Sequence, residues 1–317
     1  MICILLSTYN GERHIKDQIN SILKQSYTDW KLFIRDDCSS DKTTKIIKEY
    51  VNKFPEKIVL LEIGENNLGP CRSYLELVKN VTGDYIMFCD QDDVWLPDKI
   101  ELTYKKMKSM EEIYKNKPIL VHTDLKIVDK DLNLISHSFW KYQKLNSEIK
   151  DINKTLVQNN VTGCTIMINQ KLKELLNIVP SNAIMHDWWI NLIASTFGTV
   201  DYIYKSTVLY RQHGENNVGA KKYSLNFILS LAFKLKKLLK SNNKLINQGK
   251  EFYSIYGNML EKEQKDIVYN FITLFEVGRL KRIYRIFKYK FFKYGFLRNL
   301  GFMIVMLIPS KRKGDCK

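Results

Sequence analysis

The stretch GDYIMFCDQDDVWLPDKI, residues 83–100, decides how the chain is interpreted, because a strand-like segment ends there in a group of acids. The apolar run 85–88 is typical of a buried strand, and Asp90, Asp92 and Asp93 follow it closely. Three carboxylates at this spacing repel one another unless water or a cation neutralises them. Mg²⁺ and Mn²⁺ commonly bind through one or two carboxylates together with substrate phosphates. A solvated acidic turn would explain the same residues, so the remaining sequence has to decide.

The first 130 residues alternate between apolar runs and segments with helical periodicity. We expect strands at ICILLS (2–7), KLFIRD (31–36), KIVLLEI (57–63), DYIMFC (84–89) and ILVHTDLKIV (119–128), with amphipathic helices between them. This alternation predicts an α/β fold with a mostly parallel sheet. Ligands of such sheets bind beyond the carboxyl ends of the strands, which is where the three acids lie.

The pattern loosens between residues 130 and 220, and the chain then becomes basic and helical. We expect a strand at VTGCTIMIN (161–169), a helix beginning at HDWW (186–189), and one or two strands at TVDYIYKSTVLYRQHG (199–214). Helices are predicted from Tyr223 onward. Residues 221–317 hold 22 Lys and Arg against 6 Asp and Glu, so they carry the whole formal net charge of +16. This asymmetry indicates an anionic partner for the C-terminal third.

Polar motifs also follow the other predicted strands, and their order is informative. STYN (7–10) follows the first strand, RDDCSSDKT (35–43) the second, and ENNLGPCRSY (65–74) the third. Together with the acids after the fourth strand, this ordered set resembles the inverting family 2 nucleotide-sugar glycosyltransferases of the GT-A fold. The resemblance covers about residues 1–215. It implies a Rossmann-like, mostly parallel sheet flanked by helices, to which the basic helices form a C-terminal extension.

The resemblance implies a role for each matching position. It places Ser7 and Tyr9 on the nucleotide, Asp37 on the pyrimidine ring N–H, Arg72 near the base or diphosphate, Asp92 near sugar and ribose, and Asp93 on Mg²⁺ or Mn²⁺. Ser7 would equally serve as an ordinary helix cap, and the polar turn after the second strand as another. Residues at strand ends can serve both purposes.

An inverting transferase needs a general base that takes the proton from the attacking acceptor hydroxyl. The resemblance places this base at the start of a helix beyond the acidic motif, and Asp187 in HDWW matches that place. Trp188 and Trp189 are candidates for apolar platforms under acceptor sugars, although core packing explains tryptophans at such positions equally well. His186 stands where an acid is more common in the family.

The segment YRQHGENNVG (210–219) supplies two further candidates. In relatives a histidine in such a segment reaches the metal or the diphosphate, and His213 matches it, although a lone histidine is more often structural. A guanidinium suits phosphate geometry, so Arg211 is a candidate for a phosphate contact.

The C-terminal segment 279–313 mixes basic residues with large apolar ones, which is typical of a helix lying on an anionic membrane surface. No apolar run approaches the ~20 residues that span a bilayer, and the start of the chain does not resemble a signal peptide. We therefore expect a cytoplasmic protein at the inner face of the cell membrane. Nucleic acid is the rival partner, but no recognition motif for it is present.

The sequence thus predicts a catalytic domain over residues 1–220, with a nucleotide-sugar half to about residue 100 and an acceptor half to 220, and a membrane-associating region over 221–317. The expected activity is metal-dependent, inverting sugar transfer onto a lipid-linked saccharide in bacterial surface polysaccharide synthesis. The donor favoured by the resemblance is dTDP-rhamnose. A UDP-hexose or UDP-HexNAc donor is the first alternative, and an inactive GT-A-like module that docks on a membrane or a partner is the second.

Overall fold

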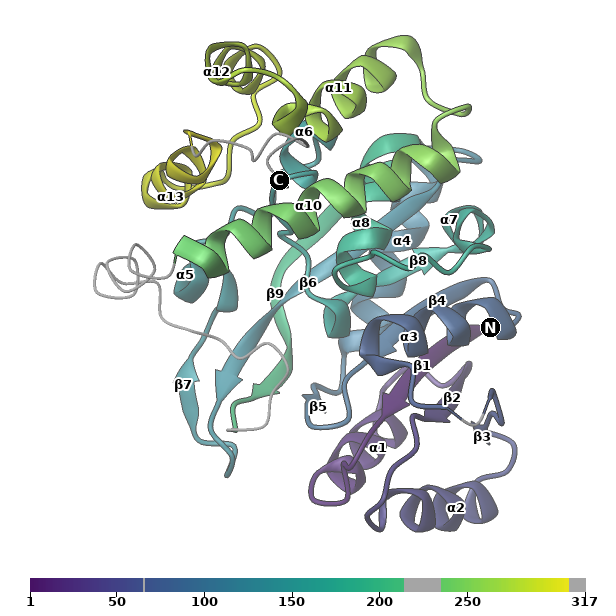
Figure 1. The fold of residues 1–317 in the computed structure, drawn as a ribbon. Coiled ribbons are helices and arrows are strands. Elements are labelled where there is room, and N and C mark those ends of the chain that lie inside the picture. The colour runs from purple at the N-terminus through teal and green to yellow at the C-terminus, as the bar shows by residue number, and fades with distance from the viewer. Residues whose placement is uncertain (65, 214–234, 308–317) are drawn as a thin grey trace.

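A single mixed sheet forms the centre of the protein (Figure 1), which we describe from a computed structural model covering residues 1–64, 66–213 and 235–307, the side chains of 235–240 excepted. The strands are β1 (Ile2–Thr8), β2 (Trp30–Asp36), β3 (Ile58–Leu60), β4 (Tyr85–Cys89), β5 (Val94–Trp95), β6 (Ile119–Val128), β7 (Leu134–Ser136), β8 (Met167–Asn169) and β9 (Thr199–Arg211). Their order in the sheet is β3-β2-β1-β4-β8-β6-β9-β5, with β7 paired to β6.

The predicted fold class is confirmed. Strands β3, β2, β1 and β4 pair in parallel, as do β6 and β9, whereas β8 runs antiparallel between β4 and β6. The helices are α1 (Ile15–Leu23), α2 (Thr43–Lys53), α3 (Gly69–Asn80), α4 (Lys99–Ile113), α5 (Phe139–Gln143), α6 (Ile152–Thr155), α7 (Gln170–Lys173), α8 (His186–Phe197), α10 (Leu235–Tyr256), α11 (Lys262–Ile272), α12 (Arg279–Lys288) and α13 (Phe296–Leu307).

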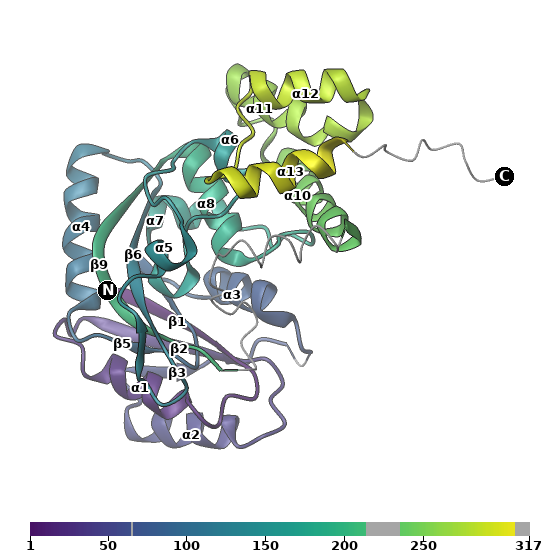
Figure 2. The same ribbon diagram turned by 90° about the vertical axis from the view of Figure 1, so that its left-hand side faces the viewer.

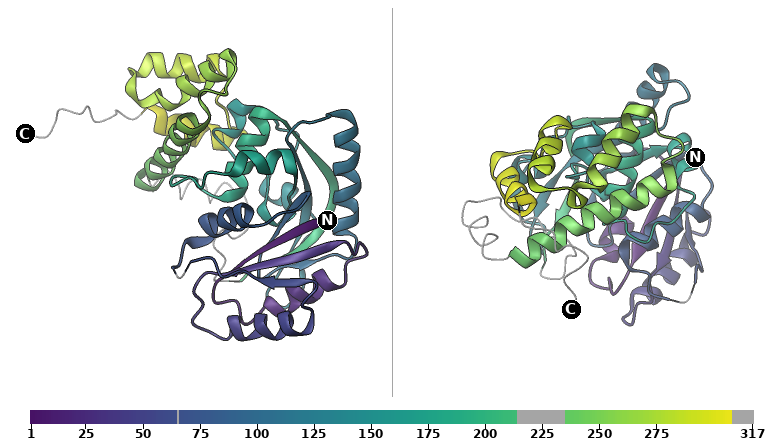
Figure 3. Two further views of the ribbon diagram at one scale, coloured as in Figure 1. Left: turned by 90° about the vertical axis from the view of Figure 1, so that its right-hand side faces the viewer. Right: turned by 45° about the horizontal axis from the view of Figure 1, so that its top comes forward.

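Successive side chains of a strand point to opposite faces of the sheet, so the core is divided into two layers. In β4, Ile86 and Phe88 face the layer that contains α3, α8 and the C-terminal helices, whereas Tyr85, Met87 and Cys89 face the layer with α1, α2 and α4. Figure 2 and the left view of Figure 3 show α1 and α2 below β1–β3 and α3 above them. The polar strand ends therefore open between two covered faces.

Parts of the predicted pattern differ from the structure, whereas the segment from residue 199 agrees with the predicted one or two strands. Only 167–169 of the predicted strand 161–169 pair as β8, because residues Gly163–Thr165 form a 3₁₀ turn. The acidic motif is followed by an additional strand, β5, in which Val94 pairs with Leu209 of β9. The segment beginning at residue 199 forms one long strand.

The described C-terminal helices pack against the layer above the sheet and share its core. Phe252 of α10, Phe271 of α11, Ile286 of α12 and Phe302 of α13 belong to the same hydrophobic cluster as the inner residues of β1 and β4. The predicted boundary at residue 220 and the predicted helix start at Tyr223 lie outside the described residues, and the division near residue 100 stays a prediction. None of the described helices is both long and apolar enough to cross a bilayer.

Candidate active site

A cavity of about 1430 Å³ opens at the carboxyl ends of β1 and β4, between the start of α8 and the C-terminal helices. Most of the predicted site residues line it, although they come from distant parts of the chain: Ser7, Tyr9, Asp37, Asp92, Asp187, Trp188 and His213. Arg72, Asp93 and Trp189 do not line it. The structure therefore brings seven of the ten predicted site residues to one cavity.

Asp92 and His213 form a pair that faces the cavity. The Nε2 atom of His213 lies 2.7 Å from Oδ2 of Asp92, and both side chains are largely buried. The neighbouring Asp93 lies behind them, fully buried, and the backbone N–H of Arg211 donates to its Oδ1. The prediction of Asp93 as the metal ligand therefore needs correction, because a ligand in the cavity meets Asp92 and His213 instead.

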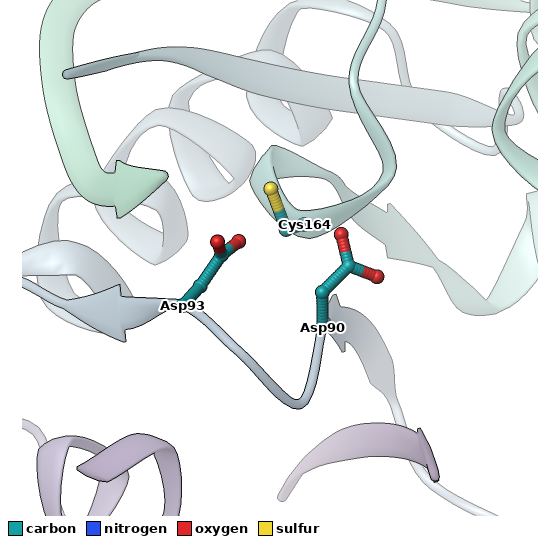
Figure 4. A group of neighbouring side chains, drawn as sticks. All are labelled: Asp90, Asp93 and Cys164. Atoms are coloured by element: carbon teal, nitrogen blue, oxygen red, sulfur yellow. The ribbon is translucent and has the colours of Figure 1, made fainter. Parts of the chain in front are cut away.

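Asp93 belongs to a second group, with Asp90 and Cys164. Their ligand atoms lie within 4.8 Å of one another, and Figure 4 shows the two carboxylates on either side of the thiol. Burial raises the pKa of Asp90 to about 7 and that of Asp93 well above its usual value, and the charge of Asp92 adds to both shifts. Burial also raises the pKa of the Cys164 thiol. Mg²⁺ and Mn²⁺ prefer oxygen ligands to sulfur, so they fit the Asp92–His213 pair at the cavity better than a group that includes a thiol.

The nucleotide half of the cavity is built on a buried ion pair. Nη1 of Arg35 donates to Oδ1 of Asp37 at 2.5 Å, and both side chains are almost fully buried. The backbone N–H groups of Leu68 and Gly69 donate to the two oxygens of the same carboxylate. The carboxylate of Asp37 thus fixes the loop before α3 while lining the cavity. Ser7 donates to Ser73, which also accepts from Arg35.

Gln91 clamps the backbone of Tyr9, a role that the sequence did not reveal. The N–H of Tyr9 donates to Oε1 of Gln91, and Nε2 of Gln91 donates back to the carbonyl of Tyr9, both at 2.9 Å. A Cβ atom at Gly11 would lie 2.4 Å from Oε1 of Gln91, so the glycine leaves room for this clamp. The ring of Tyr9 stays half exposed at the cavity edge.

Asp187 lies in the first turn of α8, as predicted, with its carboxylate on the cavity wall. Its Oδ1 accepts from the N–H of Trp188 at 2.6 Å, and its Oδ2 from the N–H of Gly163 at 3.2 Å. Burial outweighs these hydrogen bonds and raises the pKa of Asp187 to about 6. A carboxylate with this pKa is ionised at neutral pH and more basic than an exposed one, as a general base should be.

The two tryptophans of HDWW separate. Trp188 lines the cavity, and its Nε1 donates to the carbonyl of Thr155 at 2.6 Å. Trp189 is fully buried and packs edge-on against Phe252 of α10. The prediction of Trp189 as an acceptor platform is therefore corrected: its ring belongs to the core.

His186 is an uncharged side chain that packs between the acidic group around Asp90 and the hydrophobic core. Its ring stacks at 4.1 Å from that of Tyr74, whose hydroxyl donates to Asp90. Burial lowers the pKa of His186 to about 3, and neither ring nitrogen has a hydrogen-bond partner. A Cβ atom at Gly163 would lie 2.7 Å from Nε2 of His186, so only glycine fits there without movement.

The predicted phosphate contacts of two arginines need correction. The buried guanidinium of Arg211 donates to the carbonyls of Asp92 and Lys130 and to Asp17, so it anchors the acidic loop to β9. Arg72 is exposed outside the cavity. The sequence missed two other basic residues of the cavity wall, Arg13 and His14, the latter with its ring 5.2 Å from that of His213.

Comparison with known proteins identifies the class to which this site belongs. The model of glycosyl transferase family 2 matches residues 3–176, and the chain belongs to this family. It is 30% identical over 229 residues to the dTDP-rhamnosyl transferase RfbG of Shigella flexneri, covering 68% of this chain and 74% of the relative. It is also 30% identical over 173 residues to the UDP-Glc:alpha-D-GlcNAc-diphosphoundecaprenol beta-1,3-glucosyltransferase WfgD of Escherichia coli, covering 54% of this chain and 61% of the relative.

Solved structures confirm the GT-A fold. Residues 1–349 of TarS from S. aureus in complex with UDP-GlcNAc align with a TM-score of 0.53 at 16% identity, over 88% of this chain and 82% of TarS 1–349. The mannosyltransferase PcManGT of Pyrobaculum calidifontis in complex with GDP-Man and Mn²⁺ aligns with a TM-score of 0.53 at 14% identity, over 91% of this chain and 72% of PcManGT. The protein is thus a family 2 glycosyltransferase with the GT-A fold.

Proposed function

We propose that the protein is a metal-dependent, inverting glycosyltransferase that moves L-rhamnose from dTDP-rhamnose onto a lipid-linked saccharide acceptor in bacterial surface polysaccharide synthesis. The observation that carries the proposal is that the partly buried carboxylate of Asp187 and the Asp92–His213 pair open into one cavity. The rhamnosyl donor rests on the similarity to RfbG, and the lipid-linked acceptor on the similarity to WfgD. A UDP-hexose or UDP-HexNAc donor is the alternative.

The donor half of the proposed reaction uses the ends of β1, β2 and β4. Tyr9 and Asp37 face the nucleoside, and Asp92 and His213 hold Mg²⁺ or Mn²⁺. When bound, the cation neutralises the charge that develops on the departing nucleoside diphosphate. Gln91 holds the backbone of Tyr9 in place, so the contact of Tyr9 with the nucleobase is preorganised before the donor binds.

The acceptor half uses Asp187. Its carboxylate takes the proton of the acceptor hydroxyl as this oxygen attacks the anomeric carbon from the side opposite the leaving diphosphate, and the configuration inverts. The N–H groups of Gly163 and Trp188 fix both carboxylate oxygens, so the base has one orientation. Trp188 offers an apolar edge beside it for the acceptor sugar.

Membrane association is supported by the orientation of α12. Its apolar residues Leu280, Tyr284 and Phe287 are 85%, 62% and 58% exposed and recur at helical spacing, so they form one outward face. On the opposite side Arg282 is buried and donates to the carbonyls of Leu274 and Met306. An apolar face turned outward while a guanidinium is buried indicates a lipid-facing helix.

A thermal-shift panel tests the donor assignment. We expect dTDP-rhamnose to raise the melting temperature in the presence of Mn²⁺, and to raise it less after the cation is removed with EDTA. A shift with UDP sugars alone would replace the rhamnosyl donor by the alternative. No shift with either nucleotide class would contradict both donor assignments.

Vesicle sedimentation tests the membrane face. We expect Leu280→Ser combined with Phe287→Ser to lower binding to phosphatidylglycerol vesicles several-fold, because two exposed apolar side chains are lost. Ile113→Ser is the matched control, since Ile113 is equally exposed at the end of α4. Equal binding by all three proteins would contradict this role of α12.

A further inference from the structure

The C-terminal helices form one wall of the active-site cavity, in addition to the outward apolar face of α12. Residues of α13 and the segment just before it line the same cavity as Asp187 and Asp92: Lys293, Leu297, Arg298, Leu300, Gly301, Phe302, Ile304 and Val305. Most of these side chains are aliphatic or aromatic. The cavity therefore has a polar end at the strand termini and an apolar wall on α13, and a nucleotide donor explains only the polar end.

The apolar wall is open at its outer side. Leu300 and Ile304 line the cavity and are nevertheless 46% and 41% exposed. They lie one helical turn apart, so together they form a continuous aliphatic strip from the cavity to the surface. Phe296 and Leu307, at the two ends of α13, are exposed as well. Such a strip suits a ligand that has an apolar chain outside and a polar group inside the cavity.

Lys293 supplies a cation at the inner end of this wall. It lines the cavity, and burial lowers the pKa of its ammonium to about 8, with the charge of Arg298 adding to the shift. Within the described part of the chain, no carboxylate pairs with this ammonium. Its Nζ lies over the ring of Phe302, 5.4 Å from the centroid. A half-buried cation without a counter-charge is costly unless an anion binds beside it.

The backbone around Lys293 is held firmly, which a surface lysine would not require. Its N–H donates to Oδ1 of Asn299 at 2.7 Å, and Nδ2 of Asn299 donates back to its carbonyl at 2.6 Å. The N–H of Tyr294 donates to Gln158, another residue of the cavity wall. Arg298 donates to the carbonyls of Gln143 and Lys144 at the C-terminal end of α5, which links α13 to the rest of the cavity wall.

We propose that Lys293 binds the phosphate of a lipid-diphosphate-linked acceptor, and that Leu300 and Ile304 on α13 hold the first units of its lipid chain. This inference deepens the proposed function and rests on it. It assigns the acceptor to the C-terminal wall, separate from the donor phosphates near Asp92. It also explains why the lipid-facing helix α12 adjoins α13, since both would meet the same membrane-bound substrate.

Calorimetric titration with farnesyl diphosphate, farnesol and inorganic pyrophosphate tests the proposal on the full chain, with dTDP and Mn²⁺ present to fill the donor site. We expect Lys293→Gln to weaken farnesyl diphosphate binding about tenfold, the effect of one lost charged hydrogen bond, and to leave farnesol binding unchanged. Leu300→Ser should weaken both prenyl ligands and leave pyrophosphate unchanged. Lys265→Gln removes an exposed charge from α11 and should alter none of the three affinities.

Three results would overturn the proposal. The first is equal affinity of the wild type, Lys293→Gln and Lys265→Gln for farnesyl diphosphate, and the second is no binding of farnesyl diphosphate to the wild type. The third is a loss of binding to phosphatidylglycerol vesicles in Lys293→Gln as large as its loss of farnesyl diphosphate binding, which would assign Lys293 to the membrane surface. A separate titration of dTDP with Mn²⁺ into ligand-free samples of the same proteins reports on the donor site, so failure of the proposed function is distinguishable.

Discussion

Replacing Asp187 by Asn should make the protein more stable and inactive at the same time. Burial raises the pKa of Asp187 from 3.8 to about 6, so ionising it costs the folded state about 3 kcal/mol at neutral pH. Asn removes this cost, but its NH₂ group faces the N–H of Gly163 and loses a hydrogen bond of about 1 kcal/mol. The expected net gain in the free energy of unfolding is about 1–2 kcal/mol at pH 8.

The pKa of Asp187 is higher in the folded state than in the unfolded state, and this fixes how its contribution to stability changes with pH. The folded state retains the proton between about pH 4 and pH 6 while the unfolded state has lost it, so Asp187 lowers stability as the pH rises through this window. Urea unfolding of both proteins should give an advantage for Asp187→Asn at pH 8 that disappears near pH 4. Asp90 and Cys71 interact electrostatically with Asp187 and are common to both proteins.

Activity should change with pH in the opposite direction to this contribution to stability, rising as Asp187 ionises. A general base works only when ionised, so the wild-type kcat/KM should fall about tenfold between pH 7.5 and pH 5, and Asp187→Asn should lose turnover at every pH while it retains dTDP binding. A variant that is less stable than the wild type at pH 8, or that transfers sugar at wild-type rates, would refute the assignment of Asp187 as a buried base.

Two further predictions concern neighbouring residues. Asp92→Asn or His213→Ala should weaken Mn²⁺-dependent dTDP binding by about tenfold or more, whereas Asp93→Asn, whose side chain lies behind the cavity, should retain it; calorimetry that shows the reverse would restore Asp93 as the metal ligand. Gly163→Ala should destabilise the protein by about 1–3 kcal/mol in urea unfolding, because the new Cβ displaces the ring of His186; an unchanged midpoint would contradict this packing.

The sheet and the position of the site were predictable because they depend on local patterns. Apolar runs of strand length followed at once by polar residues define where strands end, and parallel strands place those ends on one edge. For this reason Ser7, Asp37 and Asp92 could be placed at strand ends from the sequence, whereas their roles and that of Asp187 followed from the resemblance. Each lies on the cavity wall in the structure.

The misplaced residues depend on contacts between distant segments. Whether Asp92 or Asp93 faces the cavity is decided by β5, which pairs with β9 more than 100 positions later and turns Asp93 inward. Trp189 is core because α10 covers it, and no local pattern distinguishes it from Trp188. The sequence likewise did not predict that α13 forms a wall of the cavity. Its basic and apolar residues predicted a membrane helix, and no local pattern linked them to the acids of the site.

The central claim is that one cavity transfers the sugar with inversion. The most direct measurement is NMR of the product formed from dTDP-rhamnose, Mn²⁺ and a panel of synthetic prenyl-diphosphate monosaccharides, with Asp187→Asn as the inactive control. The account predicts a product whose anomeric configuration is opposite to that of the donor, formed by the wild type alone. A product that keeps the donor's configuration, or one formed equally by Asp187→Asn, would contradict it.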